Sequence, residues 1–280
     1  MKRAAAVLAI AVLASTASAQ DGKDAKKGIG PKDKAPVVAS KMLAEFQKRK
    51  SAAVTESHWF GEMIEAAGDP AATFDGVLRK DFSAVKGSAE VYARGTQYLV
   101  NTGARFDPPE DLEGPEGATA MTYRNPSLFF ADLGKIAGSA QFGGEAVVEG
   151  KACVQIDFLA DAALVKQYLK EIVSRFETRM KGANNGGFGG LVGGRNSLIN
   201  IANAINEKET VATLHAWVGK DDLSCYKLEF VIRPKMKPGA LPERVRIPPL
   251  DQKTVLKFGK WDEDVPFDVA AYVKNKWAIR

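Results

Sequence analysis

Histidine is the side chain best suited to acid-base and metal chemistry near neutral pH, and this sequence contains two, His58 and His215. We predict His58 in a helical segment and His215 in a strand, and neither has another histidine at a metal-binding spacing. Both are interpreted as structural or surface residues. The sequence has no Gly-x-Ser-x-Gly nucleophile elbow. It therefore predicts no catalytic residue.

Two further motifs suggest phosphate or metal binding but lack the required ligands. The glycine-rich stretch 182–194 ends in Gly194-Arg195-Asn196, whereas a P-loop needs Gly-Lys followed by Ser or Thr. We interpret this stretch as a hinge or lid edge between two apolar helices. The acidic run 262–264 lacks the alternating oxygen ligands of a calcium loop and is interpreted as a solvated turn. No cofactor and no metal are predicted.

Cys153 and Cys225 are the only cysteines, and alternation along their strands predicts both on polar faces. A disulfide requires Cα atoms within about 7 Å of each other. The bridge is feasible if the two strands are neighbours. If the strand 211–218 lies between them, the separation is about 10 Å, twice the strand spacing. The sequence leaves both arrangements open.

The N-terminus has the pattern of a secretory signal peptide. Lys2 and Arg3 precede an apolar run over residues 4–13, and residues 17–19 form an Ala-x-Ala cleavage site. The run is shorter than the roughly 20 residues that span a bilayer. We therefore predict cleavage after Ala19, export to the periplasm or the medium, and no transmembrane anchor.

Composition limits the class of partner and the number of domains. Without Lys2 and Arg3, 37 basic residues remain against 34 acidic ones. This nearly balanced charge disfavours nucleic acid as a partner. Residues 20–36 are polar and Lys-rich, which predicts a disordered linker. Residues 37–280 are predicted to form a single domain with a glycine-rich insertion at 182–196.

The hydrophobic pattern alternates between helical and strand periods. Apolar residues at helical spacing predict a helical region over 38–67, a short helix over 128–136, and a long helix after Asp161 as a plausible N-cap. Alternation of period two predicts the remaining segments as strands. These strands are expected over 85–92 and 98–102, in a hairpin turning at 149–151, and over 211–218, 224–233 and 254–258. This arrangement favours an α+β fold with one curved antiparallel sheet.

Four segments together resemble the superfamily of bacterial lipoprotein-localisation factors and related lipid-binding envelope proteins. They are 85–100 (VKGSAEVYARGTQYLV), 144–158 (GEAVVEGKACVQIDF), 214–230 (LHAWVGKDDLSCYKLEF) and 255–269 (VLKFGKWDEDVPFDV). The resemblance implies an unclosed half-barrel whose concave face is covered by helices and encloses an apolar cavity for acyl chains. The glycine-rich insertion has no counterpart in the family. No residue of this chain aligns with a ligand-gating arginine of the family, so no site residue is carried over.

The candidate cavity residues rest on the hydrophobic pattern alone. They are the apolar residues of the short helix and of two strands: Leu128, Phe129, Phe130, Leu133, Ile136, Leu214, Tyr226, Leu228 and Phe230. These residues either line a cavity that binds lipid or form an ordinary packed core.

Three functions follow from these observations. The first is a carrier or binder of lipid acyl chains or lipidated protein in the cell envelope. The second is a module on the same scaffold that binds an envelope protein or senses envelope stress, for which an exposed apolar patch would be the sign. The third is a secreted hydrolase, which requires a polar cleft around His58 or His215.

Overall fold

The computed structural model of the chain describes residues 28–30, 32–66, 68–111, 120, 122–184, 204–240 and 250–279. The predicted signal peptide at 1–19 lies outside the described residues. So does most of the apolar helix that the sequence predicts through Leu198, Ile199, Ile201 and Ile205, since the description resumes at residue 204. So does most of the glycine-rich stretch, from residue 185 onward.

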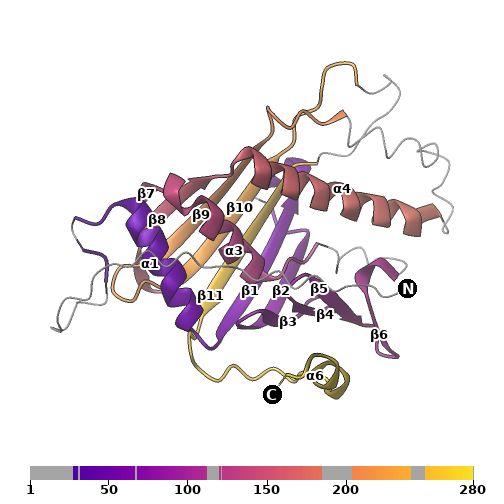
Figure 1. The fold of residues 1–280 in the computed structure, drawn as a ribbon. Helices are drawn as coiled ribbons and strands as arrows, with labels where there is room; N and C mark the ends of the chain where they lie inside the picture. The colour runs from indigo at the N-terminus through magenta and orange to yellow at the C-terminus, as the bar shows by residue number, and fades with distance from the viewer. Residues whose placement is uncertain are drawn as a thin grey trace, which may run out of the picture.

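A single antiparallel sheet of 11 strands forms the body of the protein, in the order β6-β5-β4-β3-β2-β1-β11-β10-β9-β8-β7. The two outermost strands, β6 and β7, are not paired with each other, so the curved sheet is open (Figure 1). The strands are β1 (Ala52–Phe60), β2 (Ala72–Arg79), β3 (Phe82–Lys86), β4 (Glu90–Arg94), β5 (Gln97–Asn101), β6 (Phe106–Asp107), β7 (Gln141–Val148), β8 (Lys151–Leu159), β9 (Val211–Gly219), β10 (Cys225–Arg233) and β11 (Gln252–Gly259).

Three helices lie across one face of the sheet and form what we call the helical cover (Figure 1). They are α1 (Ala35–Lys48), α3 (Pro126–Ile136) and α4 (Ala162–Asn184). Short 3-10 helices cover Gly61–Ile64, Pro109–Asp111 and Ala137–Ser139. The predicted α+β fold, with an unclosed sheet and helices over its concave face, is confirmed.

Side-chain caps explain where two of these helices begin. The carboxylate of Asp161 accepts a hydrogen bond of 2.8 Å from the backbone N–H of Leu164, as predicted for an N-cap. The side chain of Asn125 accepts one of 3.1 Å from the N–H of Ser127, and Pro126 occupies the first turn of α3. Both helices therefore begin where an otherwise unpaired backbone donor finds a side-chain acceptor.

Alternation along β2 and β3 divides the core between the two faces of the sheet. Leu78 and Val85 belong to the large apolar cluster beneath the helical cover, and their neighbours Val77 and Ala84 belong to a second cluster. The C-terminal helix α6 (Ala271–Trp277) covers this second cluster. The buried members of the second cluster are Val77, Phe82, Ala84, Tyr92, Leu99, Val269, Val273 and Trp277.

The predicted helical region over 38–67 is wrong beyond residue 48. The chain continues there as β1, which pairs with β2 on one side and β11 on the other. Its buried positions alternate through Ala52, Val54, Glu56 and His58. Two of these four inward positions are polar, so the sequence shows no period-two pattern of apolar residues in this segment. His58, predicted in a helical segment, therefore lies in a strand.

The predicted strand over 85–92 is also corrected, because the chain turns within it between β3 and β4. The N–H of Gly87 donates to the carbonyl oxygen of Ala89 at this turn. A Cβ atom at Gly87 would lie 2.2 Å from the carbonyl oxygen of Thr73, so glycine is required by this close approach. The predicted turn at Gly95 is confirmed, with a positive φ of 55°.

The predicted hairpin turn at 149–151 joins β7 and β8. Val148 pairs with Lys151, which leaves Glu149 and Gly150 as a two-residue loop. Their φ angles are 49° and 73°, and positive φ at both positions is typical of the type I′ turn that suits the twist of a hairpin.

Candidate functional site

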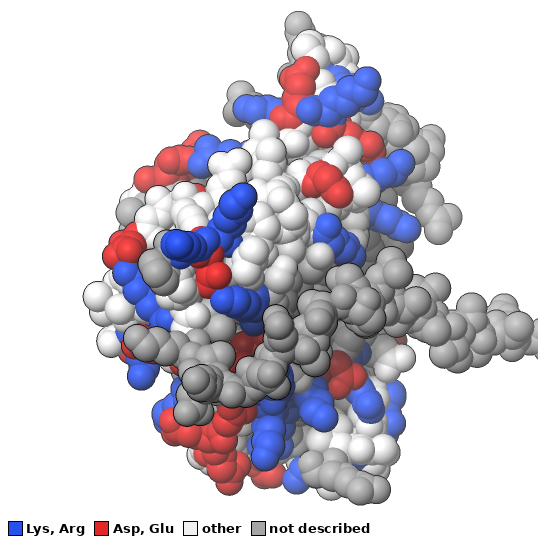
Figure 2. All heavy atoms as spheres, turned by 60° about the vertical axis from the view of Figure 1, so that its left-hand side comes forward, with Lys and Arg blue, Asp and Glu red and all other residues white. Residues whose placement is uncertain are grey.

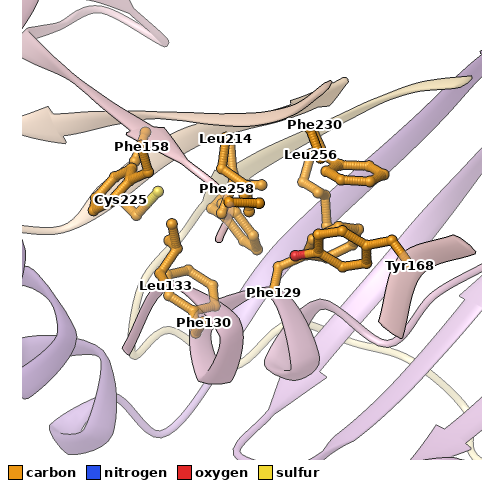
Figure 3. Packing of buried hydrophobic residues seen from close by; sticks show 14 of the residues in the cluster. Phe129, Phe130, Leu133, Phe158, Tyr168, Leu214, Cys225, Phe230, Leu256 and Phe258 are labelled. Atoms are coloured by element: carbon orange, nitrogen blue, oxygen red, sulfur yellow. The ribbon is translucent and has the colours of Figure 1, made fainter. Parts of the chain in front are cut away.

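Most of the predicted cavity residues meet between the helical cover and the sheet. From α3, Phe129, Phe130, Leu133 and Ile136 are buried, and Leu128 is half-buried. From the sheet, Leu214, Leu228 and Phe230 are buried. Figure 3 shows the α3 side chains pointing toward those of the strands, in one apolar interface.

Tyr226 is the exception, and a β-bulge is the reason. The register between β9 and β10 passes from Cys225 opposite Val218 to Lys227 opposite Trp217, so Tyr226 is the extra residue. Cys225 consequently belongs to the apolar cluster beneath the cover, whereas Tyr226 does not. The Tyr226 hydroxyl donates a hydrogen bond of 2.6 Å to Asp222.

Several aromatic residues of this interface were not among the predicted cavity residues. The ring of Phe46 on α1 stacks on Phe130 with centroids 3.7 Å apart. Tyr168 on α4 lies 4.6 Å from Phe230, measured between ring centroids. Both residues belong to predicted helical stripes, but periodicity alone does not show which strand a stripe contacts.

A group of charged residues lies between α3 and α4. The guanidinium of Arg124 donates hydrogen bonds to Asp132 at 2.8 Å and to Glu171 at 3.0 Å. Asp132 also accepts hydrogen bonds from the Tyr168 hydroxyl and, at its other oxygen, from the Lys135 ammonium. Arg124 is 4% exposed and Asp132 is 2% exposed, so this ion pair is almost fully removed from water.

Burial and charge act in opposite directions on Arg124. Burial alone would lower its pKa, but the carboxylates of Glu171 and Asp132 outweigh burial and raise that pKa above its ordinary value. Burial, followed by the Asp132 carboxylate, raises the pKa of Tyr168. Arg124 therefore stays charged and Tyr168 stays protonated across the physiological pH range.

Polar residues on β1 and β11 continue this charged group onto the sheet. The backbone N–H of Arg124 donates to Glu56 Oε1 at 3.2 Å, and His58 Nε2 lies 2.8 Å from the same oxygen. His58 Nδ1 lies 3.1 Å from the hydroxyl of Thr254, its direct cross-strand partner. We call Glu56, His58, Arg124, Asp132, Glu171 and Thr254 the polar cluster.

Two cavities lined by described residues touch the interface. A small one of about 20 Å³ lies at the polar cluster, where Arg124, Glu171 and Thr254 line it together with Tyr168 and Phe230. A larger one of about 440 Å³, which we call the edge recess, lies at the β7 edge of the sheet. Ile29, Phe142 and Val154 supply its apolar lining, and Asp33, Glu145 and Lys220 its charged groups.

The edge recess is continuous with the apolar interface. Val154 belongs to the core cluster beneath the cover, and Ile29 packs against that cluster. The N–H of Ile29 donates a hydrogen bond of 2.9 Å to the carbonyl oxygen of Lys220, which holds the segment before α1 beside the turn between β9 and β10. Figure 2 presents the side of the molecule on which α1 and β7 lie, and basic and acidic side chains are interspersed over it.

The other predicted chemistry-bearing residues lie apart from the polar cluster. His215 Nδ1 is 2.6 Å from Asp157, its cross-strand partner on β8. Cys153 and Cys225 are buried free thiols, and β9 lies between their strands, the arrangement for which no bridge is expected. Asp262, in the acidic run, pairs with Arg49 at 2.7 Å. Within the described residues, no group of three His, Cys, Asp or Glu side chains is placed to hold a metal ion.

None of the described helices is long and apolar enough to cross a bilayer.

Comparisons with known proteins give matches among solved structures alone, since no family model and no curated protein matches the chain. The lipoprotein LppX of Mycobacterium tuberculosis matches at 12% identity and a TM-score of 0.38, over 81% of this chain and 98% of LppX. LprF from Mycobacterium bovis matches at 10% identity and a TM-score of 0.40, over 86% of this chain and 98% of LprF.

A third match is a domain from Vibrio parahaemolyticus described as an outer membrane lipoprotein-sorting protein. It has 9% identity and a TM-score of 0.28, over 85% of this chain and 98% of that domain. At these identities and TM-scores the matches carry no argument, so the function proposed below rests on the chain's own residues.

Proposed function

We propose that this protein is exported and binds acyl chains, of a lipid or of a lipidated protein, between its helical cover and the concave face of its sheet. The observation that supports this most is the edge recess, which opens beside a contiguous apolar interface. Its volume of about 440 Å³ falls within the range of about 300–1,000 Å³ of small-molecule sites.

The physical basis of binding is apolar burial. Each methylene of an acyl chain that leaves water contributes about 0.8 kcal/mol. The recess provides an aromatic wall from Phe142 and aliphatic walls from Ile29 and Val154. Such surfaces make few directional contacts, which suits a carrier of flexible chains. Export from the cytoplasm, expected from residues 1–19, would place the protein among the lipids and lipoproteins of the envelope.

Filling the recess tests the proposal. Glu145 lines the recess, and its cross-strand partner Val154 belongs to the core cluster beneath the cover. Because Glu145 is exposed, we expect Glu145→Trp to fold normally and to place its ring in the recess. The variant should weaken the binding of a fluorescent fatty-acid probe by at least tenfold, as measured by titration, because about two methylenes fewer would be buried.

Gly259→Trp is the matched control. A Cβ atom at Gly259 would meet no atom within 4 Å, and this residue lies at the end of β11, outside the lining of the recess. The control should bind the probe as the unmodified protein does. Equal affinity of both variants and the unmodified protein would rule out the recess as the acyl site.

A second function is favoured by the same edge of the sheet. Phe142 and Val147 on β7 are 48% and 75% exposed, and one side of this eight-residue strand pairs with no other strand in the part of the chain that the structure describes. Long, exposed edge strands can accept an added strand from another polypeptide. Binding of an envelope protein along β7 is therefore the alternative to acyl binding.

A further inference from the structure

Three buried polar atoms of the polar cluster lack a hydrogen-bond partner among the described residues: Glu56 Oε2, His58 Nε2 and Arg124 Nη1. These residues are 0%, 2% and 4% exposed. Buried polar groups in native proteins nearly always have a partner, because leaving one unsatisfied is costly. Three such atoms at one place therefore indicate a site for a polar ligand group.

The three atoms belong to one contiguous arrangement. Glu56 Oε1 accepts a hydrogen bond from the backbone N–H of Arg124, and His58 Nε2 lies 2.8 Å from this oxygen without the alignment of a hydrogen bond. This leaves Glu56 Oε2 as a free acceptor and Arg124 Nη1 as a free donor. Arg124 also lines the small cavity, together with Thr254, the partner of His58.

The buried polar atoms without a hydrogen-bond partner indicate which chemical group could bind here. Arg124 Nη1 needs an acceptor, and the hydroxyl of Thr254, which lines the same small cavity, can donate or accept, so one hydroxyl group in the cavity can pair with both. An ammonium group cannot accept a hydrogen bond. The cavity volume of about 20 Å³ suffices for one water-sized group, which a hydroxyl matches.

Charge in the cluster disfavours an anionic group. The carboxylates of Glu56, Asp132 and Glu171 face the permanent cations Arg124 and Lys135, with the His58 ring beside Glu56. A phosphate or a further carboxylate would add negative charge beside the carboxylates of Asp132 and Glu171. An uncharged hydroxyl adds none.

We propose that the polar cluster binds a hydroxyl of an uncharged lipid headgroup of the acylglycerol type, an inference that rests on the acyl-chain binding proposed above. Glu171 has a side chain that is 32% exposed, so the outer end of the cluster reaches solvent. Thr254 lies on β11 and Val154 on β8, two strands that are three strand spacings apart, about 14 Å. The register places Thr254 level with Phe158, four residues along β8 from Val154. The headgroup site and the edge recess are therefore at two ends of one apolar interface.

Three single-chain lipids with the same acyl chain test this inference: monopalmitoylglycerol, palmitic acid and palmitoyl lysophosphatidic acid. Each competes with a fluorescent fatty-acid probe for the full-length mature protein at neutral pH. We expect monopalmitoylglycerol to bind at least tenfold more tightly than the two anionic lipids, as one hydrogen bond to the charged Arg124 and one to Thr254 would give.

Variants separate the headgroup site from the acyl site. Thr254→Val removes the hydroxyl that lines the small cavity without changing a charge, and should abolish the preference while leaving palmitic acid affinity unchanged. Thr213→Val is the matched control, because Thr213 on β9 alternates with the inward Ala212 and Leu214 and lies outside the lining of the cavity.

The outcomes distinguish the two proposals. Equal affinities for the three lipids would overturn the headgroup inference and leave acyl binding intact. Binding of none of them would overturn both. Competition by free glycerol as strong as that by monopalmitoylglycerol would assign the cluster to free polyols instead of lipids. A preference that persists in Thr254→Val would place the headgroup elsewhere.

Discussion

Replacing Arg124 by methionine is expected to lower the free energy of unfolding by about 3–5 kcal/mol, because the substitution leaves buried carboxylates without their counter-charge. Asp132 is 2% exposed and would keep only the Lys135 ammonium as a cationic partner. Glu171, which pairs with Arg124 from α4, would lose this contact as well. Urea unfolding measures the change as a lower midpoint at an unchanged slope.

The control for this substitution is an exposed arginine. Arg233 pairs with Glu65, and both side chains are about half or more exposed, at 49% and 70%. Exposed ion pairs contribute at most about 1 kcal/mol, so Arg233→Met should change stability by no more than that. A loss at Arg124 as small as the loss at Arg233 would mean that the polar cluster does not hold the cover to the sheet.

Replacing Phe130 by alanine is expected to cost about 3–5 kcal/mol, because the change removes a buried ring and leaves a cavity. Phe130 joins three elements: it stacks on Phe46 of α1, and its centroid lies 5.5 Å from that of Phe258 on β11. It is itself 2% exposed. Thermal and urea unfolding both report the loss.

An exposed aliphatic residue provides the comparison. Val147 on β7 is 75% exposed, so Val147→Ala should change stability by no more than about 0.5 kcal/mol. A similarly small effect of Phe130→Ala would contradict the packing of α3 against the sheet.

Strands with strict alternation could be predicted from the sequence, and those with polar inward residues could not. β8, β9 and β10 each alternate buried and less buried positions over nine residues, and their positions were predicted closely. In β1 the inward positions include Glu56 and His58. These residues lie inside because Arg124 and Thr254 are their partners, and those partners come from distant parts of the chain.

The polar cluster itself was beyond sequence-based prediction. Its members come from β1, β11, the segment before α3, α3 and α4, and no local spacing relates them. The bulge at Tyr226 was equally hidden, since one extra residue moved Cys225 to the inner face and Tyr226 out of the apolar cluster. The remaining predicted cavity residues needed only the face of each element, which periodicity gives.

The arrangement combines an apolar interface with a buried polar end. Apolar burial would supply the affinity for a chain, and the polar cluster would select the headgroup. The cover is held both by stacked aromatic rings and by buried ion pairs. Its three helices come from separate stretches of the chain, at 35–48, 126–136 and 162–184, so each contacts the sheet individually.

Native mass spectrometry of the protein purified from its own cell envelope, followed by organic extraction of the bound material, tests acyl binding most directly. We predict a stoichiometric ligand that carries at least one acyl chain and an uncharged hydroxylated headgroup. A ligand-free protein that also fails to bind fluorescent fatty-acid and phospholipid probes would contradict the proposed function, and would favour the binding of a protein along β7.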